Sequence, residues 1–180
     1  GGHVLLVNLG GKGPNMELGD APAEIIRFDV VRKEVDDVRL GSVLRPIPPL
    51  NPRDAVRERT FIFNRSDGQF TINGMPYDPD RIDASPRAGD VEIWTMVNKS
   101  GGWVHPVHVH MVDFEVLSRK GFDAPPPNAE TGGKDTFLLR ENETVRIIGK
   151  FAAGNRLIFS PGPDRPIWER AFVFHCHNLE

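Results

Sequence analysis

This sequence lacks disulfide partners and long apolar runs, and it has very little tyrosine. Its 180 residues include one cysteine and one tyrosine, and the net charge is only −3. A single cysteine excludes an internal disulfide, so cysteine usage does not indicate the redox compartment. No apolar run is long enough to span a bilayer, and no basic excess favours nucleic acid. We therefore expect neither a membrane nor a nucleic-acid partner.

Helical periodicity, internal repeats and a leader segment are also absent. The sequence opens on Gly-Gly-His, which is not typical of a native N-terminus, so the missing leader is uninformative. What is present is a series of short apolar stretches separated by turn residues such as Ser66-Asp67-Gly68. This pattern predicts an all-β Greek-key sandwich or barrel. The predicted strands are 60–64, 69–72, 91–98, 104–119, 136–140, 144–151, 156–159 and 171–177.

Three regions separate along the chain. Residues 1–31 contain two further strand candidates, 4–9 and 24–30, which cannot bury a core alone and are predicted to end a preceding domain. Residues 32–58 are rich in proline and predict an extended linker. Residues 59–180 form the predicted main domain, truncated at its C-terminal end.

Histidines are few, but five of the six lie in two short strand-like runs. One run is His175-Cys176-His177. Successive side chains of a strand point to opposite faces, so Cys176 should face away from both imidazoles. One segment thus offers two imidazoles to one site and a thiolate to another site behind it.

The second run is His105-Pro-Val-His-Val-His110. His108 and His110 share a face by the same period, whereas His105 has the opposite parity and can lie elsewhere. The simplest assignment puts His105 with Cys176 at one metal and the other four imidazoles at a second site. A thiolate with histidines is the ligand set of a blue-copper electron-transfer site.

This pair of motifs resembles the two copper motifs in the last domain of a multicopper oxidase. The sequence is most similar to three-domain bacterial members such as spore-coat laccases, bilirubin oxidases and phenoxazinone synthases, which implies a cupredoxin barrel. The similarity covers most of residues 59–180 and extends through Thr71-Ile-Asn-Gly-Met-Pro-Tyr-Asp78, Gly89-Asp-Val-Glu-Ile-Trp94 and Gly133-Lys-Asp-Thr136.

The resemblance implies a role for each motif residue. His105 and Cys176 resemble ligands of the type 1 copper, and His108 resembles the type 2 ligand. The remaining motif histidines resemble type 3 ligands: His110, His175 and His177. In the family a second type 1 histidine and an axial ligand follow, whereas this sequence stops at Glu180.

The family's other trinuclear ligands come from two His-x-His motifs in an N-terminal cupredoxin domain. No such pair precedes His105, and His3 stands alone. We therefore expect a C-terminal piece of a larger enzyme, which cannot reduce dioxygen by itself. That N-terminal domain is the implied protein partner.

The activity implied by the resemblance is copper-dependent oxidation. A small donor (a phenol, an aminophenol, a tetrapyrrole or a metal ion) would give electrons to the type 1 copper beside an exposed edge of His105. Cys176 would pass them to His175 and His177, and the cluster would reduce dioxygen to water. The family resemblance also suggests a location outside the cytoplasm, at the cell surface or on the spore.

Other interpretations remain open. A single-site electron carrier, or an inactive copper-binding module, needs only the type 1 set and leaves four histidines without a role. A structural domain could bind zinc, which accepts the same ligands, but ligands on both faces of one strand would then have no purpose. Residues 99–103 and 122–133 are predicted to be connecting loops, and the longer of the two could instead border the substrate site. Four aromatic residues are predicted to pack in the core: Trp94, Phe114, Phe172 and Phe174.

Overall fold

The computed structural model describes residues 2–7, 24–32, 34–35, 37–41, 48–121, 132–151 and 172–178. The chain divides into two units, residues 1–46 and 47–180. In the first unit, β1 (His3–Val7) pairs antiparallel with β2 (Glu24–Asp29), and the side chains of both strands are largely exposed. The described residues contain no helix that is long and apolar enough to cross a membrane.

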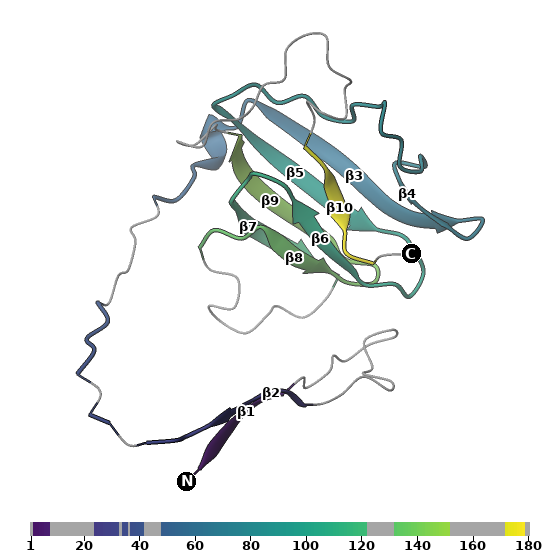
Figure 1. The fold of residues 1–180 in the computed structure, drawn as a ribbon. Coiled ribbons are helices and arrows are strands. Elements are labelled where there is room, and N and C mark those ends of the chain that lie inside the picture. The colour runs from purple at the N-terminus through teal and green to yellow at the C-terminus, as the bar shows by residue number, and fades with distance from the viewer. Residues whose placement is uncertain are drawn as a thin grey trace. The chain divides into compact units, whose positions relative to one another are not determined.

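The second unit consists of two sheets (Figure 1). The larger sheet has the strand order β4-β3-β5-β9-β7, and the smaller has the order β10-β6-β8. Pairing is antiparallel except between β3 and β5. The elements are a short 3-10 turn η1 (Pro52–Asp54), β3 (Arg57–Ser66), β4 (Gln69–Ile72), β5 (Asp90–Asn98), β6 (His105–Val109), β7 (Phe114–Lys120), β8 (Thr136–Leu139), β9 (Thr144–Phe151) and β10 (Phe174–Cys176). The all-β prediction is confirmed.

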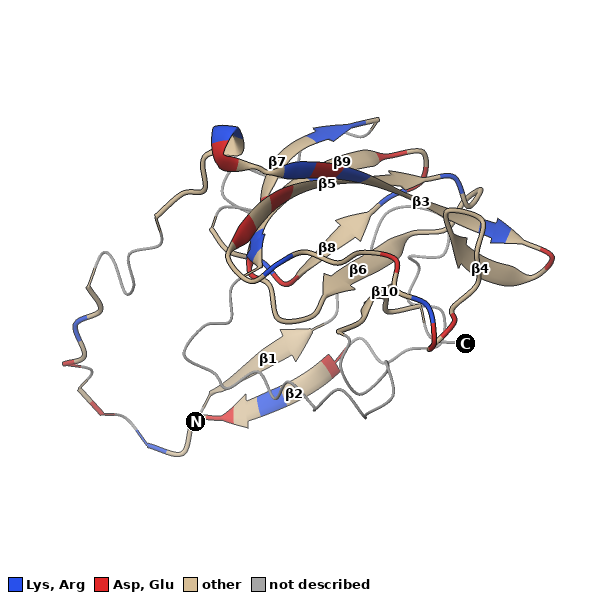
Figure 2. Cartoon of the chain, turned by 90° about the horizontal axis from the view of Figure 1, so that it is seen from above, with Lys and Arg blue, Asp and Glu red and all other residues tan. Residues whose placement is uncertain are grey.

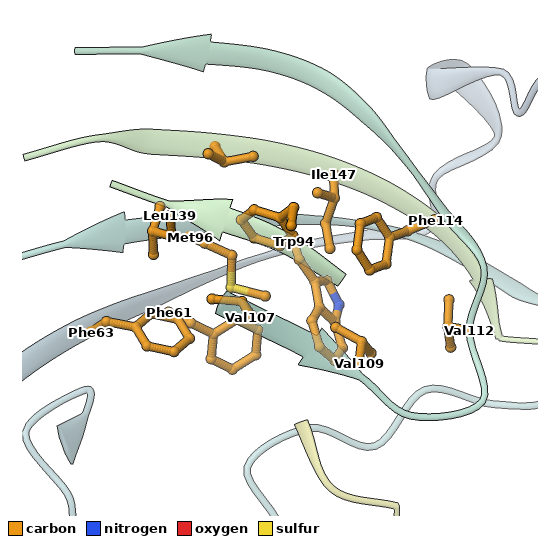
Figure 3. Packing of buried hydrophobic residues seen from close by; sticks show 12 residues of the cluster. Phe61, Phe63, Trp94, Met96, Val107, Val109, Val112, Phe114, Leu139 and Ile147 are labelled. Atoms are coloured by element: carbon orange, nitrogen blue, oxygen red, sulfur yellow. The ribbon is translucent and has the colours of Figure 1, made fainter. Parts of the chain in front are cut away.

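The core lies between the two sheets, and strand alternation decides which side chains enter it. On β6, Val107 and Val109 are buried and pack in one cluster with Phe61, Trp94 and Met96 of the larger sheet. Figure 3 shows these side chains converging on the same space. Each fully buried apolar side chain of this kind stabilises the fold by about 1.5–3 kcal/mol. The inward face of β6 is therefore held firmly in place.

The chain changes sheets at Met111, where the sequence predicts one strand over residues 104–119. Two strands are found instead, β6 in the smaller sheet and β7 in the larger. Met111 has a φ of 64°, a left-handed conformation that interrupts a strand. The corner packs closely, because a Cβ at Gly149 would lie only 2.7 Å from a methyl carbon of Val112.

Other predicted strands agree more closely with the structure. The strand predicted over 60–64 is found as the longer β3, and the one predicted over 171–177 is described as the shorter β10. The predicted strand 156–159, most of the loop 122–133 and residues 42–47 of the predicted linker lie outside the described residues. Trp94 and Phe114 are core residues and Phe174 packs against the core, but Phe172 is half exposed, so its core assignment was wrong.

Charged side chains are confined to one of the two sheets. The larger sheet carries Lys, Arg, Asp and Glu along several strands, whereas β6, β8 and β10 carry none (Figure 2). One ion pair is buried at the start of β5, where Glu92 accepts hydrogen bonds from Arg59 Nε (2.6 Å) and Trp94 Nε1 (2.8 Å). Burial acts to raise the pKa of Glu92, but these two hydrogen bonds outweigh it and lower the pKa. The smaller sheet offers imidazoles instead of charges.

Candidate metal centre

Strands β6 and β10 are neighbours, and their register brings the two histidine runs together. His175 lies opposite His108, and Cys176 lies opposite Val107. Two further backbone hydrogen bonds extend the pairing, from His110 N to Val173 O and from His177 N to Pro106 O. Residues that are more than sixty positions apart in sequence thus become direct neighbours.

Four imidazoles gather on the face of the smaller sheet that points away from the core. His108 is 4.7 Å from His110 and 5.4 Å from His177, measured between ring centroids. His175 is 5.3 Å from His110 and 4.9 Å from His177. Within the described part of the chain, no three His, Cys, Asp or Glu side chains are placed so as to hold an ion by themselves. The imidazoles therefore lie side by side without surrounding a common centre.

Hydrogen bonds orient some of these rings. His108 Nδ1 lies 2.8 Å from Asp135 O and 3.1 Å from Thr136 Oγ1, which leaves its Nε2 available. His110 Nε2 is 3.2 Å from His175 Nε2, so these two nitrogens point at one another. Burial, followed by the positive charge that the neighbouring imidazoles can acquire, lowers the pKa of His110. The cluster thus disfavours protonation of His110 and favours the neutral form that binds metal.

Cys176 and His105 lie on the opposite, inward side. Cys176 is half-buried and packs against the core cluster beside Phe174. His105 is 1% exposed and shares its face of β6 with Val107 and Val109. Cys176 and His105 both line one groove of about 690 Å³. The structure therefore places His105 and Cys176 together on the inward side of the sheet, while the four other histidines gather on the outward face. Two of these four, His110 and His175, also reach the rim of the same groove.

Burial gives His105 unusual properties. Its Nε2 lies 2.7 Å from Ser100 Oγ, whereas its Nδ1 is buried with no hydrogen-bond partner. Phe63 and Phe70 pack against the ring at centroid distances of 5.5 and 5.4 Å. Burial lowers the pKa of His105 to about 4. The expectation that His105 presents an exposed edge to a donor was wrong, because the strand alternation buries it with Val107 and Val109.

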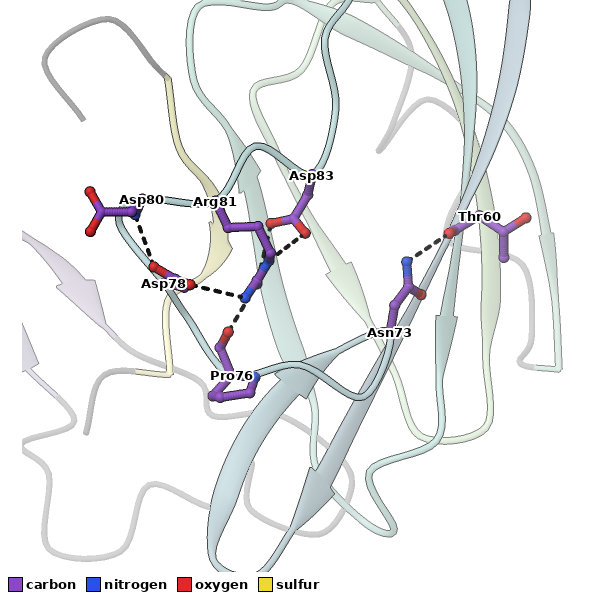
Figure 4. Close-up of polar contacts among 7 residues, drawn as sticks. All are labelled: Thr60, Asn73, Pro76, Asp78, Asp80, Arg81 and Asp83. Carbon is purple, nitrogen blue, oxygen red and sulfur yellow. Dashed lines mark hydrogen bonds and ion pairs between the residues drawn. The ribbon is translucent and has the colours of Figure 1, made fainter. Parts of the chain in front are cut away.

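The far wall of the groove is the segment that follows β4. Arg81 fixes this segment: it pairs with Asp83 (2.9 Å), approaches Asp78 (3.9 Å) and donates a hydrogen bond to Pro76 O (2.9 Å). Asn73 Nδ2 donates to Thr60 O at 3.3 Å and ties the segment to β3 (Figure 4). The groove beside Cys176 therefore has a wall that is organised by side-chain hydrogen bonds.

Two residues near His105, Asn98 and Ser100, were not predicted from the sequence to belong to the centre. Ser100 lies in the segment 99–103, which was predicted to be a connecting loop, and Asn98 ends β5. Both are buried and are linked to His105 by hydrogen bonds. The available signal was a pair of polar residues at a strand end just before a histidine motif. Two of the carbonyl groups to which Asn98 donates, those of Leu139 and Arg140, are distant in sequence.

The donor set fits copper. An unpartnered, buried imidazole nitrogen costs about 1–3 kcal/mol when nothing binds it, so its persistence in the fold points to a ligand. A thiol lies on the same side, and neutral imidazole with thiolate is the combination that selects copper in electron-transfer sites. The class of protein that this fold and these residues define is a cupredoxin-like copper domain.

Comparison with known proteins gives the family. Residues 48–180 match the family model for multicopper oxidases, so the chain belongs to that family. It is 31% identical to a laccase of Bacillus stratosphericus over 98% of this chain and 36% of that protein. It is 33% identical to a bilirubin oxidase of Albifimbria verrucaria over 96% of this chain and 28% of that protein. The chain thus spans about a third of the length of these relatives. Family membership implies copper as the cofactor, in type 1, type 2 and type 3 sites.

Solved structures of multicopper oxidases resemble this chain as well. A variant of the multicopper oxidase McoA from Aquifex aeolicus matches with a TM-score of 0.66 and 26% identity, over 84% of this chain and 35% of that one. A laccase from Pediococcus acidilactici matches with a TM-score of 0.61 and 32% identity, over 74% of this chain and 29% of that one. These matches support the cupredoxin-like fold.

Proposed function

We propose that this chain supplies part of each copper centre in a laccase-like oxidase that takes single electrons from phenol-like donors and reduces dioxygen to water. His105 and Cys176 belong to the type 1 site in this proposal. His108 is the type 2 ligand, and the type 3 ligands are His110, His175 and His177. The N-terminal cupredoxin domain of the enzyme supplies the other cluster ligands.

The observation that carries the proposal is the opposed placement of Cys176 and its two neighbours. Cys176 packs on the core side, whereas His175 and His177 join the imidazole cluster on the other side. Their shared backbone connects the two sides through a few covalent bonds, which is a short route for electrons. A structural zinc site would gain nothing from this arrangement.

Each residue has a task that its surroundings support. Burial keeps His105 neutral at ordinary pH, so its nitrogen lone pair is free to bind metal. The contacts of His108 Nδ1 orient that ring with Nε2 outward. When bound, copper supplies one-electron chemistry with the donor at the type 1 site and oxygen reduction at the cluster. The groove beside Cys176 is lined largely by apolar side chains, which lowers access of water to the thiol.

The test is the colour of the full-length protein loaded with copper. A thiolate bound to type 1 copper should give a strong absorption band at about 600 nm. Cys176→Ser should abolish both this band and oxidase activity. Val173→Ser, a change at a half-exposed position of the same segment, should leave both in place and serves as the control.

Two results would contradict the proposal. If Cys176→Ser retains the blue band and the activity, Cys176 is not the type 1 ligand. If metal analysis finds stoichiometric zinc and no copper, the scaffold interpretation replaces the oxidase. A full-length sequence without two upstream His-x-His motifs would instead favour the electron carrier.

A further inference from the structure

A short polar chain inside the barrel ends at His105. Ser100 Oγ lies 2.7 Å from His105 Nε2, and the same hydroxyl donates to Asn98 Oδ1 at 2.6 Å. Asn98 is fully buried and Ser100 is 7% exposed. Polar side chains buried this deeply need a reason, because each loses its contacts with water.

The donor and the acceptor of each hydrogen bond that links Asn98, Ser100 and His105 can be assigned. Asn98 Nδ2 lies within hydrogen-bond distance of three carbonyl oxygens, those of Trp103 (2.6 Å), Arg140 (3.0 Å) and Leu139 (3.3 Å). Carbonyl oxygens only accept, so the amide nitrogen must stand on this side. Asn98 Oδ1 accepts the backbone N–H of Ser100 at 2.9 Å, which requires the amide oxygen on the other side.

The direction of the Ser100 hydroxyl follows from this orientation. Its one proton goes to Asn98 Oδ1, so towards His105 it can only accept. His105 must then carry its proton on Nε2. The second ring nitrogen, Nδ1, is left with a free lone pair, and it is the buried nitrogen that has no partner.

We propose that Asn98 and Ser100 are positioning residues that hold His105 in the tautomer with Nδ1 free to bind the type 1 copper. This inference rests on the proposed function and adds residues for which the motifs gave no role. Partners of this kind, one contact removed from the metal, fix ring orientation and raise ligand basicity. Phe70 fixes the ring from another side, with its plane at 87° to the imidazole.

Asn98 is itself anchored by a buried ion pair. Its backbone N–H donates to Glu143 O at 2.9 Å, and Glu143 Oε2 accepts the backbone N–H of Arg140 at 2.8 Å. Glu143 Oε1 accepts from Arg119 Nη1 at 2.7 Å. The carbonyl of Arg140, to which Asn98 donates, is thereby fixed. The glycines Gly101 and Gly102 adopt positive φ angles of 63° and 92°, in the turn that joins Ser100 to Trp103.

The first experiment needs no copper. Nitrogen-15 spectra of the metal-free, histidine-labelled full-length protein distinguish a protonated ring nitrogen from an unprotonated one. His105, assigned by its loss in His105→Gln, should show its proton on Nε2. Ser100→Ala should shift it towards a mixture of tautomers, and Ser100→Thr, which keeps the hydroxyl, should restore the native pattern. Thr71→Val, which removes another buried hydroxyl that lines the same groove, should change nothing.

The second experiment measures copper binding and the potential of the blue site. Ser100→Ala should weaken type 1 copper binding by about 10–100-fold and shift the potential, while Ser100→Thr and Thr71→Val stay near wild type. A native His105 protonated on Nδ1 would overturn the inference. So would a Ser100→Ala protein with unchanged tautomer and unchanged affinity. If the tautomer behaves as expected but no variant binds copper at Cys176, the proposed function fails and only the assignment of the His105 tautomer stands.

Discussion

The two faces of β6 place the same side chain in opposite circumstances. On the inward face, His105 is 1% exposed, is packed by aromatic rings and is held by a defined hydrogen bond. On the outward face, His108 is half-buried and lies beside three other imidazoles. His105 is held in place by residues of its own domain, whereas the four outward imidazoles mainly contact one another.

This difference separates two tasks within one short strand. His105 is packed in the core and lies within hydrogen-bond distance of Ser100, so its ring is positioned without a bound metal. The three strands of the outward cluster carry no charged side chain. His108 also keeps its Nε2 available for a ligand, because its hydrogen-bond contacts are made through Nδ1. The outward cluster is suited to complete a metal site together with another domain.

The largest expected effect is on the outward face. In the full-length, copper-loaded protein, His110→Ala should reduce oxygen consumption by more than about 100-fold. Loss of a residue that only hydrogen-bonds to a metal ligand already costs about 10–100-fold, and loss of a ligand should cost more. The blue band should remain, because His105 and Cys176 are untouched. His3→Ala removes a histidine outside both runs and should leave oxygen consumption unchanged. Loss of the band in His110→Ala would show that the two faces are not separable.

The next largest effect is expected on the free energy of unfolding when a buried ion pair is broken. Glu143→Gln should lower the free energy of unfolding by about 3–5 kcal/mol, because it removes one partner of a fully buried pair with Arg119. Glu58→Gln is the matched change in the exposed pair with Arg146 and should lower it by at most about 1 kcal/mol. Urea denaturation measures both. Equal losses would contradict the assigned burial of Glu143.

A third comparison uses adjacent leucines of β8. Leu139 is fully buried and lies opposite His105, whereas Leu138 is only half-buried and faces the other way. Leu139→Ala should lower the free energy of unfolding by about 2–5 kcal/mol. Leu138→Ala should lower it distinctly less. A larger loss at Leu138, measured by the same denaturation, would show that the assignment of the two faces is reversed.

The smallest expected effect is a pH dependence of the metal-free chain. The pKa of His105 is about 4 in the fold, against an ordinary value of 6.5. Between these values the unfolded chain binds the extra proton and the folded chain does not. Stability from this residue is therefore present above pH 6.5 and is lost as the pH falls towards 4, by at most about 3 kcal/mol.

The measurement is the difference in unfolding free energy between wild type and His105→Leu as the pH is varied. Subtraction removes the contribution of carboxylates that titrate in the same window. The difference should change between pH 6.5 and 4 and be flat above that range. A flat difference throughout would mean that His105 is not buried as a neutral ring.

The separation of the two sites could be predicted from the sequence because strand alternation is local. The positions of Cys176 and the adjacent histidines follow from a period of two, and this needs no distant contact. The burial of His105 was within reach of the same rule, since Val107 and Val109 share its parity. The expected exposed edge came from the family resemblance and ignored that pattern.

Other features depend on contacts that a local pattern does not contain. The corner at Met111 requires a positive φ, which methionine rarely adopts. The sequence pattern therefore predicts one continuous strand over residues 104–119. The role of Asn98 depends on Leu139 and Arg140, which lie 41 and 42 residues further along the chain. Phe172 was assigned to the core because it alternates with Phe174, but β10 begins only at Phe174 and the structure leaves Phe172 half exposed.

The pairing of β10 with β6 also has a consequence for the order of events during synthesis. β10 is an edge strand of three residues, and its partner β6 is made more than sixty residues earlier. The five strands of the larger sheet, together with β6 and β8, leave the ribosome before β10 does. Bringing such distant segments together is slow relative to local hairpins. His108 therefore meets its partner His175 only after most of the barrel has been made, so the proposed copper ligands come together as one of the last steps of folding.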